Sequence, residues 1–355
     1  MKIGLIGLKQ SGKTTIFSAL TRSDSKMLFD GKKEPNVGKI QVADPRINQL
    51  VQIYQPKKTT YASIECIDFD GFQEEKSKGV SASELSLIKN LDALALVVRN
   101  FHDDLINETL GKPDPIRDVE KIQTELILSD LIVAESRIER IEHSMKRGQK
   151  TPALENEKKI LTKALECLHA EKPIASIEFS PEDKKQLRGF QFLSMKPVLV
   201  IVNSSEDNFG KNEEILSVLA QQCMTIEFAG RFEMELSRLN DEDASVFMED
   251  MKINASARER LSMCLYDLLG LISFFTVGDD EVRAWTIKKG DTALDAANAI
   301  HSDLARGFIR AERFTCEDLI AHESEKTLKA NGLFHLEGKT YQVKDGDILS
   351  IRFNV

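Results

Sequence analysis

Residues 7–14 of the chain read Gly7-Leu8-Lys9-Gln10-Ser11-Gly12-Lys13-Thr14, which fits the pattern G-x-x-x-x-G-K-[ST]. An apolar strand is expected before this loop, over residues 2–7, and a helix after it, over residues 14–20. In such a loop the backbone N–H groups point at phosphate oxygens, and the helix adds the positive end of its dipole. The strand, loop and helix together predict a site for the phosphates of a nucleotide.

The residue types in this loop indicate how the nucleotide is held. The Lys13 ammonium group is expected to reach the β- and γ-phosphates, and the Thr14 hydroxyl to bind Mg²⁺. All residues of the loop, together with Thr15, are therefore candidate nucleotide-binding residues.

A second motif, which is acidic, follows an expected strand over residues 64–67. The chain there reads Asp68-Phe69-Asp70-Gly71. The pattern D-x-x-G in this place predicts that Asp68 acts on the water shell of Mg²⁺ and that the Gly71 N–H lies near the γ-phosphate. Asp70 is an equally acidic neighbour, so the choice between the two aspartates depends on the phase of the strand. The candidate catalytic residues are Lys13, Asp68 and Gly71, and the candidate Mg²⁺ ligands are Thr14 and Asp68.

A third motif, Asn203-Ser204-Ser205-Glu206, follows an expected strand over residues 197–202. GTPases carry N-K-x-D in this place, where the Asp accepts hydrogen bonds from guanine. This chain has no Lys there, and Glu replaces Asp, so guanine selectivity does not follow. Asn203, Ser205 and Glu206 are candidate nucleotide-binding residues, as is Gly230 after a weaker strand over residues 224–228. An ordinary turn also explains the Asn-Ser-Ser run.

The spacing of apolar residues predicts the wider organisation of the chain. Short apolar strands alternate with helices in the first 100 residues and from residue 197, which is typical of a mostly parallel sheet. Between them, apolar residues spaced by four and three run over 127–141 and, after a break at 147–152, over 154–168. This pattern predicts a helical hairpin, either packed on itself along one seam or binding a partner.

The last part of the chain has a different character. Strands are expected over residues 281–287, 332–336, 339–343 and 347–353, with a helix over 292–301, which indicates a small α+β domain. We therefore expect an α/β domain at 1–116 and 190–273, an inserted helical arm at 117–189 and an α+β domain at 274–355.

Composition and charge exclude several classes of protein. The chain has 355 residues, 41% of them hydrophobic and 30% charged, and no apolar run long enough to span a membrane. Five widely spaced cysteines and the lack of H-x-x-x-H argue against a disulfide framework or a zinc site and favour a cytoplasmic protein. A net charge of −9 predicts no sequence-specific DNA binding. A local basic cluster, Lys146, Arg147 and Lys150 in the hairpin turn, is a candidate contact, or simply a solvated turn.

Nearly the whole chain resembles the YchF family of Obg-like P-loop proteins. The resemblance lies in the phosphate loop, the N-x-x-E motif and further stretches along the chain, which are Glu34-Pro35-Asn36-Val37-Gly38, Ala43-Asp44-Pro45-Arg46, Val98-Arg99-Asn100-Phe101, Asp130-Leu131, Glu281-Val282-Arg283-Ala284-Trp285-Thr286, Gly307-Phe308-Ile309-Arg310-Ala311-Glu312, Leu336-Glu337-Gly338-Lys339 and Arg352-Phe353-Asn354-Val355. It implies a P-loop G-domain, an inserted helical arm and a C-terminal TGS domain of the ubiquitin-like β-grasp fold. It also implies slow hydrolysis of ATP in preference to GTP, and association with ribosomes or other translation components.

The chain departs from the family pattern in its phosphate loop and in the segments that sense the γ-phosphate. Lys9-Gln10-Ser11 stands where the family has Pro-Asn-Val, and Lys32 stands where the family has a Thr that closes over Mg²⁺. Phe72 occupies the place of the catalytic Gln of other GTPases, as hydrophobic residues do in the family. Two functions therefore stay open, a slow nucleotide-hydrolysing switch and a nucleotide-binding scaffold with little or no hydrolysis. A small-molecule kinase would need an Arg-rich lid, which the sequence lacks.

Overall fold

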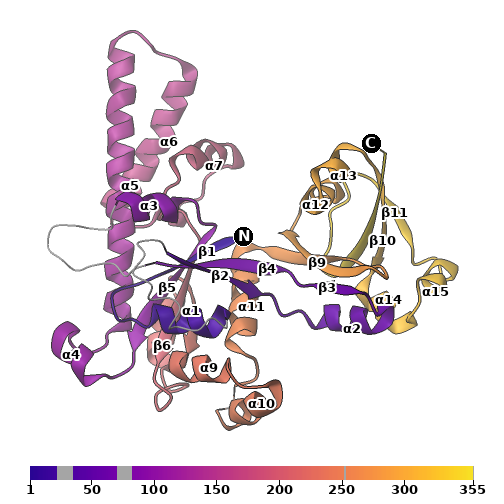
Figure 1. The fold of residues 1–355 in the computed structure, drawn as a ribbon. Helices are drawn as coiled ribbons and strands as arrows, with labels where there is room; N and C mark the ends of the chain where they lie inside the picture. The colour runs from indigo at the N-terminus through magenta and orange to yellow at the C-terminus, as the bar shows by residue number, and fades with distance from the viewer. Residues whose placement is uncertain (22–34, 70–81, 252, 355) are drawn as a thin grey trace. The chain divides into compact units, whose positions relative to one another are not determined.

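The computed structural model describes residues 1–21, 35–69, 82–251 and 253–354 (Figure 1). The chain forms two compact units, one comprising Met1–Gly38 and Glu65–Asn254 and the other Lys39–Ile64 and Ala255–Val355. It passes between the units inside strands β2 (Asn36–Gln41) and β4 (Ser63–Asp68). The division into three domains at the expected residues stays a prediction.

The first unit is built on a six-stranded sheet in the order β2-β4-β1-β5-β6-β7. Strand β1 pairs in parallel with β4 and β5, and β6 pairs in parallel with β5 and β7, as the alternation of strands and helices predicts. The other strands of this sheet are β1 (Lys2–Ile6), β5 (Ala93–Asn100), β6 (Val198–Ser204) and β7 (Met224–Phe228). All eight residues of β5 are buried, which explains why it reads as a continuous apolar run.

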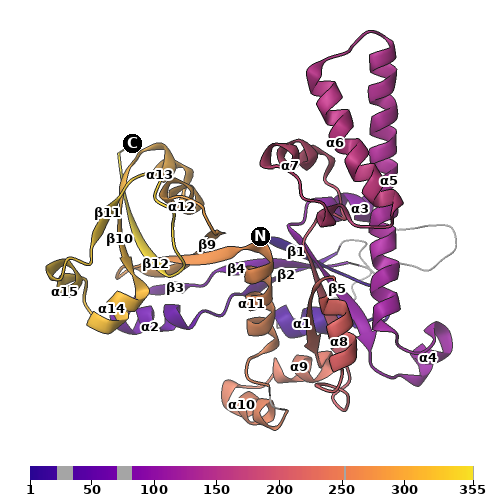
Figure 2. The same ribbon diagram turned by 180° about the vertical axis from the view of Figure 1, so that it is seen from behind.

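Helices cover both faces of this sheet. Helix α1 (Lys13–Thr21) packs on α9 (Gly230–Leu236) on one face. On the other face α3 (Ala82–Lys89), the first turns of α5 and α8 (Glu213–Ala220) share a core with the strands (Figure 2). The remaining described helices of this unit outside the arm are α4 (Asp104–Leu110) and α10 (Asp241–Asp250). The phosphate loop therefore leads directly into α1, which packs on the sheet, as the motif predicts.

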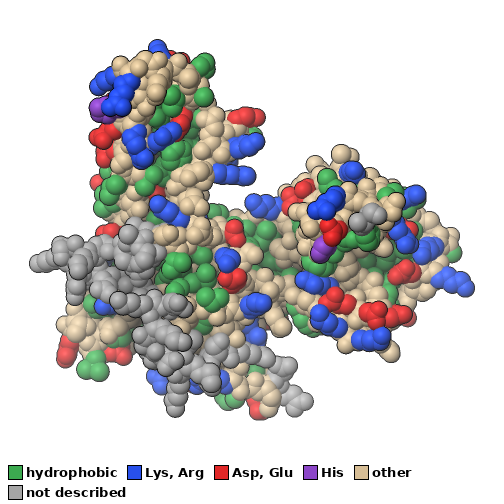
Figure 3. All heavy atoms as spheres, turned by 45° about the horizontal axis from the view of Figure 1, so that its top comes forward, with side chains coloured by type: hydrophobic (Ala, Val, Ile, Leu, Met, Phe, Trp, Pro, Cys, Tyr) green, Lys and Arg blue, Asp and Glu red, His purple; other side chains and the backbone are tan. Residues whose placement is uncertain are grey.

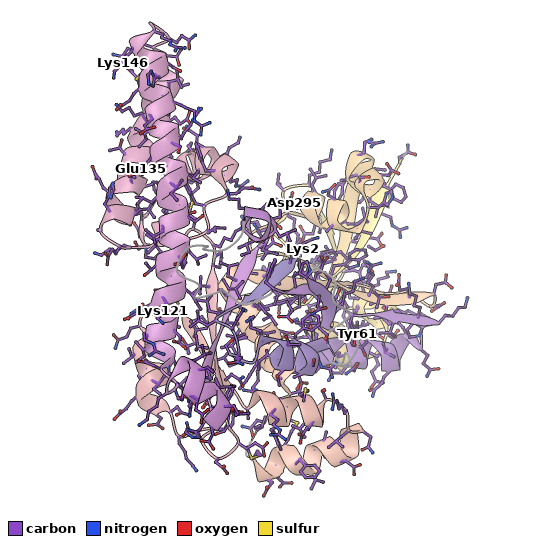
Figure 4. All side chains as sticks on the ribbon, turned by 60° about the vertical axis from the view of Figure 1, so that its left-hand side comes forward. Lys2, Tyr61, Lys121, Glu135, Lys146 and Asp295 are labelled. Carbon is purple, nitrogen blue, oxygen red and sulfur yellow. The ribbon has the colours of Figure 1, made fainter. Side chains whose placement is uncertain are left out.

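The helical arm consists mainly of two long helices, α5 (Pro115–Lys146) and α6 (Pro152–His169), which confirms the predicted hairpin. The Thr151 side chain caps α6, whose first residue is a proline, so the turn ends where the break in the pattern predicts. Smaller helices complete the arm, namely η2 (Ile174–Ser176), α7 (Pro181–Leu187) and η3 (Arg188–Phe190). Figure 4 labels Lys121, Glu135 and Lys146 along α5, with Lys146 at its free end.

One buried carboxylate fixes the arm to the chain that returns to the sheet. Asp130 of α5 is 1% exposed, and its two oxygens accept hydrogen bonds from the backbone N–H groups of Leu193 and Ser194 at 2.8 and 2.7 Å. Burial raises the pKa of Asp130, although these hydrogen bonds oppose the shift. The arm is therefore tied to the residues just before β6.

The second unit holds a sheet in the order β11-β10-β12-β8-β9-β3. Strands β8 and β9 form an antiparallel hairpin, which helix α12 follows along the chain. The last strand, β12, runs parallel to β8 in the middle of the sheet, and this order is the β-grasp arrangement. Its strands are β3 (Lys58–Thr60), β8 (Leu271–Thr276), β9 (Glu281–Lys288), β10 (Phe308–Thr315), β11 (His335–Glu337) and β12 (Asp347–Phe353). Its helices are α2 (Pro45–Tyr54), α11 (Ala257–Leu269), α12 (Ala293–Ile300), α13 (Ser302–Arg306), α14 (Cys316–His322) and α15 (Glu325–Ala330).

Several strands of the second unit differ from the prediction, since β3 and β8 are not among the expected strands. Residues 339–343 form no strand, because they make only the isolated bridge Thr292↔Gln342 beside the start of α12. Strand β10 was not predicted, since a bulge between Phe308 and Arg310 and several charged residues break its apolar alternation. In the described ranges no helix has the length and hydropathy needed to cross a membrane.

Candidate functional site

The phosphate loop is shaped by two glycines that leave no room for a side chain. A Cβ atom on Gly7 would lie 2.3 Å from the Val97 carbonyl oxygen, and one on Gly12 would lie 2.1 Å from Nδ2 of Asn203. Gly12 also has a φ of +90°, which favours glycine. These glycines let the backbone approach both β5 and the end of β6, as a phosphate cradle requires.

The loop holds its lysine in place. The Lys13 side chain is 7% exposed, and its ammonium group donates to the carbonyl oxygens of Gly7 and Leu8 at 3.3 and 3.0 Å. Helix α1 begins at Lys13, so its first N–H groups face the loop. Oγ of Ser11 is buried and makes no hydrogen bond within the described ranges, which suits a site built for an anion's oxygens. Lys9 and Gln10 are exposed, and Thr15 lies in the first turn of α1.

The proposed Mg²⁺ ligands meet beside the loop. Oγ1 of Thr14 donates to Oδ2 of Asp68 at 3.0 Å, and Asp68 is 4% exposed at the last position of β4. Nδ2 of Asn36, at the start of β2, lies 3.5 Å from the same oxygen. A hydroxyl and a carboxylate are hard oxygen ligands, and Mg²⁺ usually takes only one or two protein carboxylates beside water and phosphate. The residues present therefore fit this ion, and no group of three His, Cys, Asp or Glu that could hold a metal occurs in the described part of the chain.

Some predicted residues of this part of the site lie outside the described residues. They are Gly71, its neighbours Asp70 and Phe72, and Lys32. Asn36 was not among the predicted site residues. Its place in the stretch Glu34-Pro35-Asn36-Val37-Gly38, which carries part of the family resemblance, was the signal that could have found it.

The predicted base motif joins the phosphate loop to α9. Nδ2 of Asn203 donates to the Ser11 carbonyl oxygen at 3.0 Å, and the Gly230 N–H donates to Oδ1 of Asn203 at 3.1 Å. A Cβ atom on Gly230 would lie 2.5 Å from Oδ1 of Asn203, so this contact needs the glycine. Ser205 is half-buried and Glu206 is exposed, directly after β6. The structure thus brings Asn203, Gly230 and the loop together and presents Glu206 to solvent.

Burial shifts the pKa values of two side chains near the site, Cys66 and Arg99. It raises the pKa of the Cys66 thiol on β4, and the Asp68 carboxylate adds to this shift, so Cys66 is an inert core side chain. Burial lowers the pKa of Arg99 at the end of β5, where the guanidinium donates to Oδ1 of Asn107 at 2.8 Å and to the Gly111 carbonyl oxygen. Arg99 therefore braces the loop that contains α4.

Comparison with known proteins shows similarity along the whole chain. The ribosome-binding ATPase YchF of Bacillus subtilis (strain 168) is 39% identical over 363 residues, covering 99% of each chain. The protein of the same name from Escherichia coli O157:H7 is 35% identical, and that from Haemophilus ducreyi 37%, each over 100% of this chain and 99% of the relative. The structure of the Schizosaccharomyces pombe YchF GTPase matches 99% of this chain and 97% of its own, with a TM-score of 0.86 and 29% identity.

A family model named YchF-GTPase_C, described as a protein of unknown function (DUF933), matches residues 271–354. The parallel sheet, the phosphate loop at the start of α1 and the Thr14–Asp68 pair define a P-loop nucleoside triphosphatase. Within that class, the chain belongs to the YchF family.

Proposed function

We propose that this protein binds ATP with Mg²⁺ and hydrolyses it slowly, as a switch that associates with ribosomes in the cytoplasm. The observation that carries the proposal is the Thr14–Asp68 contact at 3.0 Å beside the buried Lys13. The similarity to proteins named ribosome-binding ATPase YchF supports both the nucleotide and the partner.

The residues of the loop provide the chemistry of phosphoryl transfer. Lys13 leaves the carbonyl oxygens of its own loop and donates to the β- and γ-phosphates, where it stabilises the charge that develops on the transferred group. Thr14 and Asp68 would hold Mg²⁺, which would neutralise charge on the phosphate oxygens. The Gly71 N–H is assigned to the γ-phosphate. Because Phe72 offers no group that orients water, hydrolysis is slow.

The base is read by the residues after β6. Glu206 is assigned to the exocyclic amine of adenine, because a carboxylate accepts a hydrogen bond from that amine. Guanine carries the carbonyl oxygen O6 at the same place, which a carboxylate repels. Ser205 and Gly230 are assigned to the same end of the nucleotide, and Asn203 joins Gly230 to the phosphate loop.

Titration with fluorescent ATP and GTP analogues, with and without Mg²⁺, tests this assignment. We expect tighter binding of the ATP analogue, and a loss of about 10- to 100-fold in Lys13→Ala, since hydrogen bonds to charged groups contribute about 1.5–3 kcal/mol each. Thr14→Val should abolish the gain in affinity that Mg²⁺ provides. Lys289→Ala, which changes an exposed lysine of the second unit, is the matched control.

Turnover separates the switch from the nucleotide-binding scaffold. We expect slow hydrolysis that disappears in Lys13→Ala while its circular dichroism spectrum is unchanged. Equal turnover in Lys13→Ala and the wild type would refute the catalytic assignment. Nucleotide binding without any turnover in the wild type would favour the scaffold.

The free end of the arm is the proposed contact with ribosomal RNA. Lys146 and Arg147 are exposed there, where Figure 3 shows several Lys and Arg side chains together. Lys150 is paired with Glu155 at 3.0 Å, so it contributes less free charge than its two neighbours. A small basic patch of this kind binds phosphates without reading sequence.

A further inference from the structure

A buried polar network lies at the carboxyl ends of β5, β6 and β7. Nδ2 of Asn100 donates to Oγ of Ser204 at 3.0 Å, and Ser204 donates to Oε1 of Glu227 at 2.5 Å. Nδ2 of Asn212 donates to the same Glu227 oxygen at 2.5 Å. All four residues are at most 8% exposed. Neither the phosphate cradle nor the Mg²⁺ ligands use any of them.

Glu227 also holds the loop that follows β6, residues 205–212, which we call the base loop. Its second oxygen, Oε2, accepts from the Gly210 backbone N–H at 3.0 Å, at a position where φ is +75°. Asn212 closes the loop further by donating to the Asn208 carbonyl oxygen at 2.6 Å. At its other end the loop begins with a turn, in which the N–H groups of Asn208 and Phe209 donate to the Ser205 carbonyl oxygen. One carboxylate therefore fixes the far side of the turn that presents Glu206.

The register of the sheet explains why Glu227 can do this. Glu227 pairs with Val202 on β6, and the next pair is Phe228 with Asn203. The side chains of a pair lie on the same face of the sheet, and those of successive pairs lie on opposite faces. Asn203 contacts the phosphate loop from one face of the sheet, and Ser204 contacts Glu227 from the other. The backbone leading into Ser205 and Glu206 is thus fixed on both faces.

Burying a carboxylate in a strand is costly unless its oxygens accept hydrogen bonds. A hydrophobic residue at this position would lie beside Val202, its paired residue on β6 and a member of the core, at no such cost. The placement of an acceptor here, with donors from the base loop on both of its oxygens, indicates a role in holding that loop.

We propose that Glu227 is a positioning residue for adenine recognition, which fixes the base loop so that Glu206 meets the exocyclic amine of the base. This inference rests on the proposed function, in which Glu206 selects ATP over GTP. It adds a residue that touches neither the nucleotide nor the metal, and that acts through the Gly210 N–H and the Asn212 side chain.

The test is the ratio of GTP to ATP dissociation constants in Glu227→Gln. Glutamine keeps the size of the side chain but replaces one acceptor oxygen with an NH₂ group, which cannot accept from Gly210 or from Ser204. We expect the ratio to fall about tenfold, which corresponds to about 1.4 kcal/mol. The KM for ATP should rise by more than kcat falls, and the affinity for inorganic tripolyphosphate with Mg²⁺ should stay within twofold of the wild type.

Glu214→Gln is the matched control, because it makes the same change at an exposed position of α8. It should keep the wild-type ratio. Amide hydrogen exchange gives a second readout, since the Gly210 amide should lose protection in Glu227→Gln and keep it in the control. If Glu227→Gln fails to fold, as judged by its melting curve, Ser204→Ala replaces it and should lower the ratio in the same direction.

Glu206→Gln distinguishes failure of the inference from failure of the proposed function. If Glu206→Gln loses the preference for ATP while Glu227→Gln and Ser204→Ala retain it, the positioning role is wrong and the proposed function stands. A wild-type protein that binds ATP and GTP equally overturns both. Loss of the preference in Glu206→Gln and Glu227→Gln, with less than additive loss in the double variant, supports the inference.

Discussion

Replacing Asn203 with alanine removes the side chain that joins the phosphate loop to α9. In the wild type this amide donates to the Ser11 carbonyl oxygen at 3.0 Å and accepts from the Gly230 N–H at 3.1 Å. Ser11 is 2% exposed and Gly230 is also buried, so the Ser11 carbonyl oxygen and the Gly230 N–H would both lose a hydrogen bond inside the protein. Asn203→Ala should therefore affect stability and nucleotide binding together.

The contacts set the size of the effect. A buried donor or acceptor left without a partner costs about 1–3 kcal/mol, so two such groups cost about 2–6 kcal/mol. Water that enters the gap left by the side chain offsets part of this cost. We expect the free energy of unfolding to fall by about 2–4 kcal/mol and the affinity for ATP to fall about tenfold, because the loop then has to be ordered by the nucleotide itself.

Urea unfolding and equilibrium titration with a fluorescent ATP analogue measure the two effects. Asn203→Asp gives a second perturbation, since it keeps the acceptor for Gly230 but places a carboxylate oxygen against the Ser11 carbonyl oxygen. It should weaken ATP binding more than Asn203→Ala, because it adds negative charge beside the phosphates. Asn298→Ala, which makes the same change at an exposed position of α12 in the second unit, is the control. A change below 1 kcal/mol in Asn203→Ala, with unchanged affinity for ATP, would refute the reasoning.

Two further predictions concern the arm. Because burial raises the pKa of Asp130 above its ordinary 3.8, its contribution to stability is fully present below pH 3.8 and is lost as pH rises through the raised pKa. The difference in free energy of unfolding between the wild type and Asp130→Asn should therefore fall as pH rises from 3.8, and urea titrations that show it constant or rising would contradict this assignment. Reversing the charges in Lys146→Glu with Arg147→Glu should reduce co-sedimentation with ribosomes, most strongly at low salt, while ATP affinity stays unchanged. Equal co-sedimentation would remove the free end of the arm as a contact.

The parts of the fold that the sequence predicts well are those whose signals are local. The phosphate loop is a continuous motif, and β5 and β6 are continuous apolar runs because both of their faces are buried. The hairpin turn is predicted by the break in the apolar spacing at 147–152, and in the structure Thr151 caps the helix that follows it. In each case the residues that decide the structure are neighbours in the chain.

Contacts between distant residues set the limit of that prediction. Arg46 donates to Asp345, which lies 299 residues further on, and to Asp44. The hydrogen bonds to these carboxylates, first of all the one to Asp44, raise the pKa of Arg46, although burial opposes the shift. No pattern near Arg46 indicates that α2 belongs with the C-terminal unit. Glu227 is a similar case, because its role depends on Ser204 and Gly210, which only folding brings beside it.

The pairing of β3 with β9 also has a consequence for how the protein is made. Lys58 of β3 pairs with Glu281, and the neighbouring Lys57 pairs with Asp280, 223 residues later in the chain. At a synthesis rate of about 5–20 residues per second, residues 57–60 leave the ribosome about 10–45 s before their partners exist. The sheet of the second unit therefore cannot be completed while the first unit is being translated. A fragment that begins at residue 271 would lack β3, so the edge of β9 would be exposed and prone to pair with other chains.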